Sequence, residues 1–345
     1  MKRIGVITGG GDCPGLNAVL RGIVLKAVSL GIETYGFRHG FQGLMNSGEY
    51  INLEYEDVED FLIPGSTILR TSRTNPFAHK GGPEQIINNL KRLRCEALIV
   101  IGGNNIISST YRLAKEYKLK AVCVPKSVQN GVPNTDYCFG FLSTVNYATE
   151  AIDRLHTTAR SYNRCLVIET TGQKVGWVAL YSGLASGAHE ILIPEFKYSL
   201  PEVCRLVKQR RKQGKEYTLI VLAEGAKPKN LKSYKTKSVV KDDYGNDMIS
   251  GASEWLSAQI RKKTRIDTRN VVLSSILRSG SPTNYDRILG LRFGSKAMEI
   301  AANKKFNTMV SLKGNEITTL SLKTVAGKIR KVPAILYKEA KTYLK

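Results

Sequence analysis

Short apolar runs alternate along the chain with longer stretches in which apolar residues recur at helical spacing. Short runs bounded by glycine, proline or polar residues are typical of buried strands in parallel sheets. The runs that predict strands are Arg3–Thr8, Thr34–Phe37, Ala97–Ile101, Ala121–Val124, Leu166–Glu169, Glu190–Ile193, Thr218–Ala223, Asn270–Leu273 and Thr308–Leu312. Helical patterns lie between most of them, at Leu16–Ser29, Glu84–Arg92, Ser108–Tyr117, Leu142–Thr158, Pro201–Arg211, Ala252–Arg261 and Asn284–Ala302. This alternation predicts an α/β fold with mostly parallel sheets and helices on both faces.

Length and hydropathy fit a protein with large cores. The chain has 345 residues, of which 42% are hydrophobic, and this is enough for two domains. No apolar run approaches the roughly 20 residues that span a bilayer, so we expect no membrane association. The first strand pattern follows Met1-Lys2-Arg3 directly, which predicts no targeting segment and a cytoplasmic protein, or one that stays in its compartment of synthesis.

The charge is unevenly distributed. Lys and Arg number 52 against 29 Asp and Glu, and residues 201–345 hold 31 basic against 12 acidic residues, a net of +19. Such a basic region is either a solvated face or a surface for an acidic partner or RNA. The polar, lysine-rich stretch from Lys227 to Asn246 is expected to be an exposed excursion.

The six cysteines form no closely spaced pair and lie in or beside apolar patterns. We therefore expect small core residues in a reducing compartment, without disulfides or metal. They are Cys13, Cys95, Cys123, Cys138, Cys165 and Cys204.

Two loops carry candidate chemistry. The glycine-rich turn Gly9–Gly15 joins a strand to a helix, where backbone N–H groups can bind a phosphate, although tight turns also use glycine for steric reasons. The strand Ala121–Val124 delivers a second loop to the sheet edge. A phosphoryl-transfer enzyme would carry a carboxylate there to accept a proton, but this loop has Ser127, Gln129 and Gly131 instead.

Seven segments in order resemble one family. GGGDCPGLNAVLRGIV, GSTILRTSRTNPF, IGGNN, VPKSVQNGVPNTDYCFGF, EAIDRLHTTARSYNR, AEGAKP and ILRSGSPTNYDR are similar to the motifs of the bacterial A-type 6-phosphofructokinases, which use ATP or pyrophosphate. The resemblance implies the phosphofructokinase fold, with two Rossmann-like three-layer α/β/α domains and an active site in the cleft between them. It also implies a glycolysis-related role, a fructose 6-phosphate or related sugar-phosphate ligand, and a homo- or hetero-tetramer of phosphofructokinase-type subunits.

The resemblance also suggests the domain boundaries. A larger nucleotide-side domain is expected from residues 1–140 and about 277–304. A smaller sugar-phosphate-side domain is expected from residues 141–276 and about 305–345.

Four positions depart from the family's catalytic pattern. Where active members have the aspartate that handles magnesium and the donor phosphates, the general base, a second aspartate and a charge-stabilising arginine, this chain has Asn104, Gln129, Gly131 and Gln173. An amide can hold a hydrogen bond, but it cannot accept a proton at neutral pH or match a carboxylate as a Mg²⁺ ligand. We therefore expect no metal-binding residues, and Mg²⁺ with ATP or pyrophosphate only if the protein is active. Two acids nearby, Asp12 and Asp136, are possible replacements for the base.

The positions for the sugar phosphate are better preserved. Residues that in the family clamp the phosphate and contact the sugar hydroxyls correspond to Arg164, Arg269, Arg278 and Glu224. A guanidinium suits a phosphate bidentately. The alternative is that these arginines serve an interface or the surface, and the family's usual histidine in this region is Ser275 here.

On the donor side the backbone cradle survives. The residues expected to bind the nucleotide or pyrophosphate are Gly10, Gly11, Arg73, Gly102 and Gly103. Arg73 is equally well explained as a surface charge. Lys126 resembles the lysine of pyrophosphate-using members, but the donor preference stays open.

Three hypotheses follow. The first is a catalytically inactive or strongly impaired homologue, a pseudoenzyme that acts as a sugar-phosphate-binding regulatory or structural subunit. The second is an active 6-phosphofructokinase with rearranged catalytic groups. The third is a basic scaffold protein recruited to a ribonucleoprotein or another acidic assembly. Because four charged groups are missing, we expect the first, and so no enzyme or a very weak one.

Overall fold

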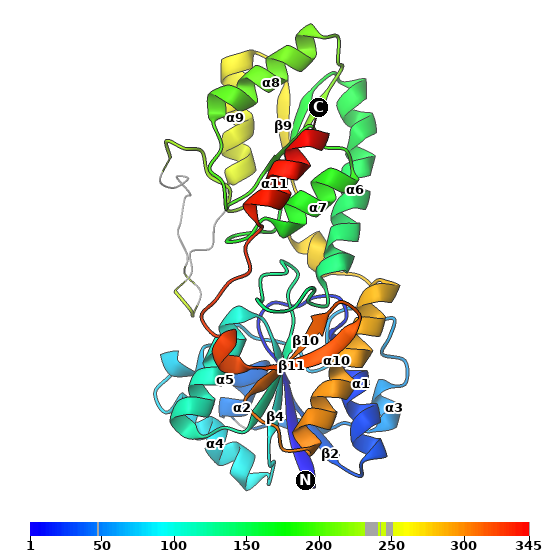
Figure 1. The fold of residues 1–345 in the computed structure, drawn as a ribbon, viewed down its shortest axis with the longest axis vertical. Helices are drawn as coiled ribbons and strands as arrows, with labels where there is room; N and C mark the ends of the chain where they lie inside the picture. The colour runs from blue at the N-terminus through cyan, green and yellow to red at the C-terminus, as the bar shows by residue number, and fades with distance from the viewer. Residues whose placement is uncertain (47, 232–240, 242, 246–250, 345) are drawn as a thin grey trace. The chain divides into compact units, whose positions relative to one another are not determined.

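The computed structural model describes residues 1–46, 48–231, 241, 243–245 and 251–344. The chain divides into two compact units (Figure 1). Unit 1 comprises Met1–Ser143, Asp242–Asn246 and Arg278–Arg330, and unit 2 comprises Thr144–Lys241, Asp247–Leu277 and Lys331–Lys345. The predicted polar excursion Lys227–Asn246 lies mostly outside the described residues.

Unit 1 is built on a seven-stranded sheet with the strand order β11-β10-β5-β4-β1-β2-β3. Its strands are β1 (Arg3–Thr8), β2 (Glu33–Phe37), β3 (Tyr50–Asn52), β4 (Leu98–Gly102), β5 (Ala121–Pro125), β10 (Thr308–Lys313) and β11 (Glu316–Ser321). Strands β10, β5, β4, β1 and β2 pair in parallel, and the edge strands β3 and β11 pair antiparallel.

The helices of unit 1 cover both faces of this sheet. They are α1 (Leu16–Ser29), α2 (Gly40–Asn46), α3 (Tyr55–Val58), α4 (Gly82–Arg92), α5 (Asn104–Tyr117) and α10 (Asn284–Ala302), with short 3₁₀ turns at Pro76–Ala78 and Leu322–Thr324. Successive strand residues face opposite ways: Ile99 and Ile101 lie in a cluster with α1 and α10, whereas Leu98 and Val100 lie in a cluster with α2, α4 and α5. Both faces are therefore buried, as the continuous apolar runs predict.

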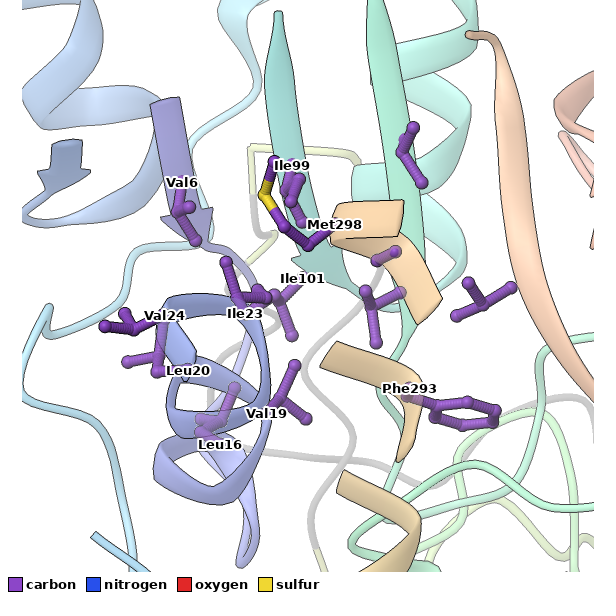
Figure 2. Packing of buried hydrophobic residues seen from close by; sticks show 14 of the residues in the cluster. Val6, Leu16, Val19, Leu20, Ile23, Val24, Ile99, Ile101, Phe293 and Met298 are labelled. Carbon is purple, nitrogen blue, oxygen red and sulfur yellow. The ribbon is translucent and has the colours of Figure 1, made fainter. Parts of the chain in front are cut away.

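Helices α1 and α10 lie side by side and fill one face of the sheet (Figure 1). Leu20 and Ile23 of α1 and Met298 of α10 point into the same cluster as Ile99 and Ile101 (Figure 2). Glycines allow the backbones to approach closely. A Cβ on Gly22 would lie 2.3 Å from the Leu291 carbonyl oxygen, and one on Gly294 would lie 2.2 Å from that of Val19.

Unit 2 has a parallel four-stranded sheet in the order β7-β8-β6-β9. The strands are β6 (Cys165–Thr170), β7 (Glu190–Leu192), β8 (Thr218–Ala223) and β9 (Thr268–Val272). The helices are α6 (Phe141–Ser161, in this unit from Thr144), α7 (Trp177–Ala185), α8 (Leu200–Lys212), α9 (Ala252–Thr264) and α11 (Ala334–Ala340), with 3₁₀ turns at Ser274–Arg278 (in this unit up to Leu277) and Lys341–Tyr343.

The sheet of unit 2 is also covered on two faces. Ile220 and Leu222 of β8 share a cluster with residues of α8 and α9. Val221, between them in sequence, faces Gly183 of α7 on the opposite side. The expected α/β fold with mostly parallel sheets is confirmed.

One predicted boundary is wrong. Residues 305–330 were expected in the smaller domain, but they belong to unit 1. Strand β10 pairs with β5 and then turns back into β11, so this segment completes the larger sheet. Apart from an apolar run at Thr308–Leu312, no sequence pattern signals this turn.

The cysteines are core residues, as expected. All six are free thiols; five are buried and Cys95 is half-buried. Burial raises the pKa of the Cys123 and Cys138 thiols to about 12, so both are protonated and unreactive at neutral pH.

The glycine contact between α1 and α10 predicts a loss of stability. Gly22→Ala and Gly294→Ala should each lower the free energy of unfolding by about 1–3 kcal/mol, because the added methyl group overlaps a backbone carbonyl that cannot move without separating the helices. Thermal unfolding followed by circular dichroism measures this. Val28→Ala on the exposed side of α1 is the matched control and should change stability by less than about 0.5 kcal/mol. Equal melting temperatures for all variants would contradict the close contact.

Candidate functional site

The switch point of the unit 1 sheet lies between β1 and β4, because the chain passes from β1 to β2 on one side and later places β4 on the other. Ligands of open α/β sheets bind at the carboxyl ends of the strands at such a point. Here the glycine loop Gly9–Gly15 follows β1 and residues Gly103 and Asn104 follow β4. The Gly9 amide donates to the Ile101 carbonyl at 2.9 Å, so the loop starts against β4.

Lys126 follows β5 and joins its loop to the glycine loop. Its side chain is only 4% exposed, and Nζ donates to the carbonyl oxygens of Gly9, at 2.8 Å, and Gly11. Its own amide donates to the Gly102 carbonyl at 3.0 Å. The ends of β1, β4 and β5 are thus tied together by one residue.

Two arginines complete a cluster of positive charge at the glycine loop. Nη1 of Arg278 lies 2.5 Å, and Nη2 of Arg73 3.4 Å, from the point that a Cβ on Gly11 would occupy. Lys126 Nζ lies 3.3 Å from the corresponding point on Gly10, whose φ of 88° itself favours glycine. Side chains at these glycines would fill the space that the cations face.

Within the described residues, neither Arg73 nor Arg278 forms an ion pair with an acid. Asp12 is the one acid of the glycine loop, and its charge acts on Lys126. Three cations beside backbone amides, with a single carboxylate among them, favour the binding of an anion.

Burial, and to a lesser extent the neighbouring charges of Arg278 and Arg73, lowers the pKa of the Lys126 ammonium to about 8. The three positive charges therefore repel one another, and a bound anion offsets this repulsion. Lys126 is charged at neutral pH but loses its proton just above that range.

Hydrogen bonds order Asn104 and the loop that follows β5. The Asn104 amide nitrogen donates to the carbonyl oxygens of Gly131, at 2.9 Å, and Lys328, at 2.7 Å. The Ser127 hydroxyl accepts from the amides of Gln129, at 3.2 Å, and Gly131, at 3.3 Å. The loop after β5 is thus held by its own side chains.

Asp136 does not lie ready to accept a proton. One carboxylate oxygen accepts from the Gly314 amide at 2.7 Å, and the other pairs with Lys313 Nζ at 3.4 Å. Asp136 therefore secures the turn between β10 and β11. Among the residues that the structure describes, none holds the Asp12 carboxylate in a comparable hydrogen bond or ion pair.

Protein ligands for Mg²⁺ do not fit this site well. Mg²⁺ sites in proteins use one or two carboxylates together with substrate phosphates. Within the described part of the chain no group of three His, Cys, Asp or Glu residues is placed to hold a metal. The Asn104 nitrogen points at two carbonyl oxygens, and the cations at the glycine loop repel a metal ion.

In unit 2, Glu224 follows β8 at the carboxyl end of the sheet. Its carboxylate accepts from the Gly172 amide at 3.0 Å and from the Thr171 hydroxyl at 3.3 Å, both after β6. The Gln173 carbonyl oxygen lies 2.0 Å from the point that a Cβ on Gly225 would occupy, so only glycine fits after Glu224. The structure brings Glu224 and Gln173 together at one end of this sheet.

The two unit 2 arginines lie together elsewhere. Nε of Arg164 lies 3.2 Å and Nε of Arg269 3.3 Å from the Asp267 carboxylate. Arg164 precedes β6, so this pair lies near the amino end of the strands, and Glu224 lies past their carboxyl end. At about 3.3 Å per residue, a six-residue strand separates these groups by roughly 15–20 Å. Arg278, expected with them, lies instead at the glycine loop of unit 1.

Sequence reasoning missed two features of these sites. Asp267 holds both arginines, and an acid two residues before Arg269 is the only signal that could have shown it. The approach of Arg278 to Gly11 joins residues far apart in the chain, and no local pattern predicts it.

A parallel sheet whose switch point carries a glycine loop surrounded by cations is an arrangement suited to a phosphate anion. The phosphofructokinase family model matches residues 3–301. The chain is 43% identical over 343 residues to the pyrophosphate–fructose 6-phosphate 1-phosphotransferase of Amycolatopsis mediterranei, covering 99% of each chain. It is 40% identical to the ATP-dependent 6-phosphofructokinase of Corynebacterium efficiens, over 96% of this chain and 95% of that one. The chain belongs to the phosphofructokinase family.

A solved phosphofructokinase structure supports this family assignment. The phosphofructokinase of Pichia pastoris, crystallised in the T-state, superposes with a TM-score of 0.82 at 28% identity, over 94% of this chain and 35% of that one.

The relatives overturn one expectation. We expected a catalytically inactive or strongly impaired homologue, a pseudoenzyme, but relatives that match nearly the whole chain are named as phosphotransferases and kinases. That expectation is wrong. It assumed that the neutral residues at four positions remove the catalytic machinery, and it placed Arg278 at the sugar phosphate instead of at the glycine loop.

The expectation of an acidic partner finds no support in the comparisons. None of the relatives reported above is named as a nucleic-acid-binding or scaffold protein.

Among the described residues, no helix is both long and apolar enough to cross a bilayer.

The lowered pKa of Lys126 predicts how binding depends on pH. Pyrophosphate affinity should fall about tenfold one pH unit above the pKa of about 8, because only the charged tenth of the protein then binds well. Calorimetric titrations at pH 7 and pH 9 measure this change.

Two variants separate Lys126 from the ionisation of pyrophosphate itself. Lys126→Met should bind weakly at both pH values, and any change it still shows belongs to the ligand. Lys126→Arg keeps its charge at pH 9 and should lose the decline. If the wild-type affinity changes between pH 7 and pH 9 by the same factor as that of Lys126→Met, the result contradicts the role of Lys126.

Proposed function

We propose that this protein is a 6-phosphofructokinase that transfers a phosphoryl group from pyrophosphate or ATP to fructose 6-phosphate with rearranged catalytic groups. The observation that carries the proposal is the cation-surrounded glycine loop at the switch point of unit 1. The names of relatives at 43% and 40% identity, with nearly complete coverage, support it.

We assign the donor phosphates to unit 1. The amides of Gly10 and Gly11 and the backbone at Gly102 and Gly103 bind the phosphate oxygens, while the nearby cations stabilise charge on the transferring group. Phosphoryl transfer passes through a loose transition state, so positioning and charge stabilisation provide most of the catalysis. The oxygen of the sugar's 1-hydroxyl forms a bond to the terminal phosphorus, and the anhydride bond breaks to release phosphate or ADP.

We assign the proton of the attacking hydroxyl to Asp12. Gln129 cannot accept it, and Asp136 is engaged at the β10–β11 turn. Asp12 is half-buried within the glycine loop, beside the groups that bind the donor. A carboxylate here replaces the base that the loop after β5 lacks.

We assign the acceptor sugar to Glu224 and the arginines. Glu224 accepts hydrogen bonds from sugar hydroxyls, and Arg164 with Arg269 binds the 6-phosphate. Because these groups lie at opposite ends of the unit 2 sheet, one sugar phosphate meets both only when two copies of the chain contribute, which fits an oligomer of phosphofructokinase-type subunits.

Turnover tests the proposal directly. With fructose 6-phosphate and pyrophosphate or ATP, product should form well above a protein-free blank, and Asp12→Asn should lower kcat by about 10²–10⁴. Asp136→Asn is the matched control and should retain turnover, since its carboxylate only secures a turn. No product with either donor would refute the proposed function, and an Asp12→Asn variant as active as wild type would refute the role of Asp12.

Shared sites predict complementation between damaged subunits. Glu224→Gln and the double variant Arg164→Ala, Arg269→Ala should each be nearly inactive with saturating donor. When the two are unfolded together and refolded as mixed oligomers, about a quarter of the sites should regain all three groups. Recovered activity in a coupled assay measures this. If a single copy supplied the whole site, mixing would restore nothing.

A further inference from the structure

The Asn104 side chain donates hydrogen bonds to two backbone carbonyl oxygens that a carboxylate could approach only with a cation between them. Its amide nitrogen lies between two carbonyl oxygens, at 2.9 Å from Gly131 and 2.7 Å from Lys328. An aspartate here would put a carboxylate against both oxygens, and that arrangement is stable only with a cation between them. The neutral amide satisfies both carbonyls without a metal ion.

A strap from the C-terminal part of unit 1 fixes this arrangement. We define the strap as residues 326–330. The Gly327 amide donates to the Ser108 hydroxyl at 3.0 Å, and the Arg330 amide donates to the Gly131 carbonyl at 2.9 Å. The Arg330 guanidinium also donates to the Asp136 carbonyl at 2.5 Å. Because the strap is held on both sides of Lys328, the Asn104 nitrogen is fixed between its acceptors.

The positive charge that a metal would supply is already present at the glycine loop. Lys126, Arg73 and Arg278 converge on Gly10 and Gly11, and the two arginines have no acidic partner among the residues described. Guanidinium groups bind phosphate oxygens bidentately, and a buried ammonium adds a point charge. A phosphate anhydride carries several negative charges, so three cations can balance it directly.

We propose that the glycine loop with Lys126, Arg73 and Arg278 binds the donor's phosphate anhydride as the free anion, without a divalent metal ion. The inference rests on the proposed function for the identity of the donor. It deepens that function by replacing a metal-bound donor with a donor held by side-chain cations alone.

Calorimetric titration of sodium pyrophosphate into the full-length protein tests this, once in EDTA and once in excess MgCl₂. The dissociation constants should agree within about threefold. Arg73→Gln and Arg278→Gln should each weaken binding about tenfold or more in EDTA, because each removes a charge-assisted hydrogen bond. Lys80→Gln, an exposed cation of the same unit, is the matched control and should leave the affinity unchanged.

A second variant reverses the proposed device. Asn104→Asp returns a carboxylate to the two carbonyl oxygens, so its pyrophosphate affinity should fall about tenfold in EDTA and recover with MgCl₂. Thermal unfolding with and without MgCl₂ gives a readout that does not depend on turnover, since the metal should raise the melting temperature of this variant and not that of the wild type.

The outcomes separate this inference from the proposed function. Wild-type binding that appears only with MgCl₂, or no binding in either buffer, overturns the inference. Metal-independent binding without any turnover supports the inference and refutes the proposed function. Turnover together with metal-dependent binding supports the function and overturns the inference.

Discussion

The ammonium group of Lys126 is the contact on which the unit 1 site depends. It is buried, it comes from the end of β5, and it donates to carbonyl oxygens of the loop that follows β1. A cation in this position costs desolvation energy, which its two hydrogen bonds offset only in part, so its pKa is lowered. The same contact that orders the glycine loop therefore leaves positive charge in it for an anion to neutralise.

The sequence was sufficient for most of the fold. Strands such as β1 and β8 were predicted at their observed bounds, because parallel strands buried on both faces appear as continuous apolar runs. Strand β3 was missed because it is short and exposed at a sheet edge, and β11 because its side chains alternate only weakly. An antiparallel edge strand is determined more by pairing with its neighbouring strand than by its own amino-acid composition.

Only those residues of the candidate site that lie next to predicted strands could be located from the sequence. The glycine loop and Lys126 directly follow strands, so their location at the sheet edge was predictable from the sequence. The approach of Arg278 to Gly11 and the sharing of Asp267 by two arginines are tertiary contacts between distant segments. The mistaken expectation of an inactive protein has the same origin, because a residue-by-residue comparison did not show that Arg278 lies at the glycine loop.

The division of unit 1 along the chain also bears on how the protein folds during synthesis. The inner face of α1 is covered by α10, and β5 gains its outer neighbour from β10, both of which are encoded after the strands of unit 2. The nascent chain therefore exposes apolar surface on α1 and an open edge on β5 while unit 2 already has all its strands. Such surfaces attract other chains and chaperones, so the vulnerable period in the life of this protein falls before residues 284–313 have been made.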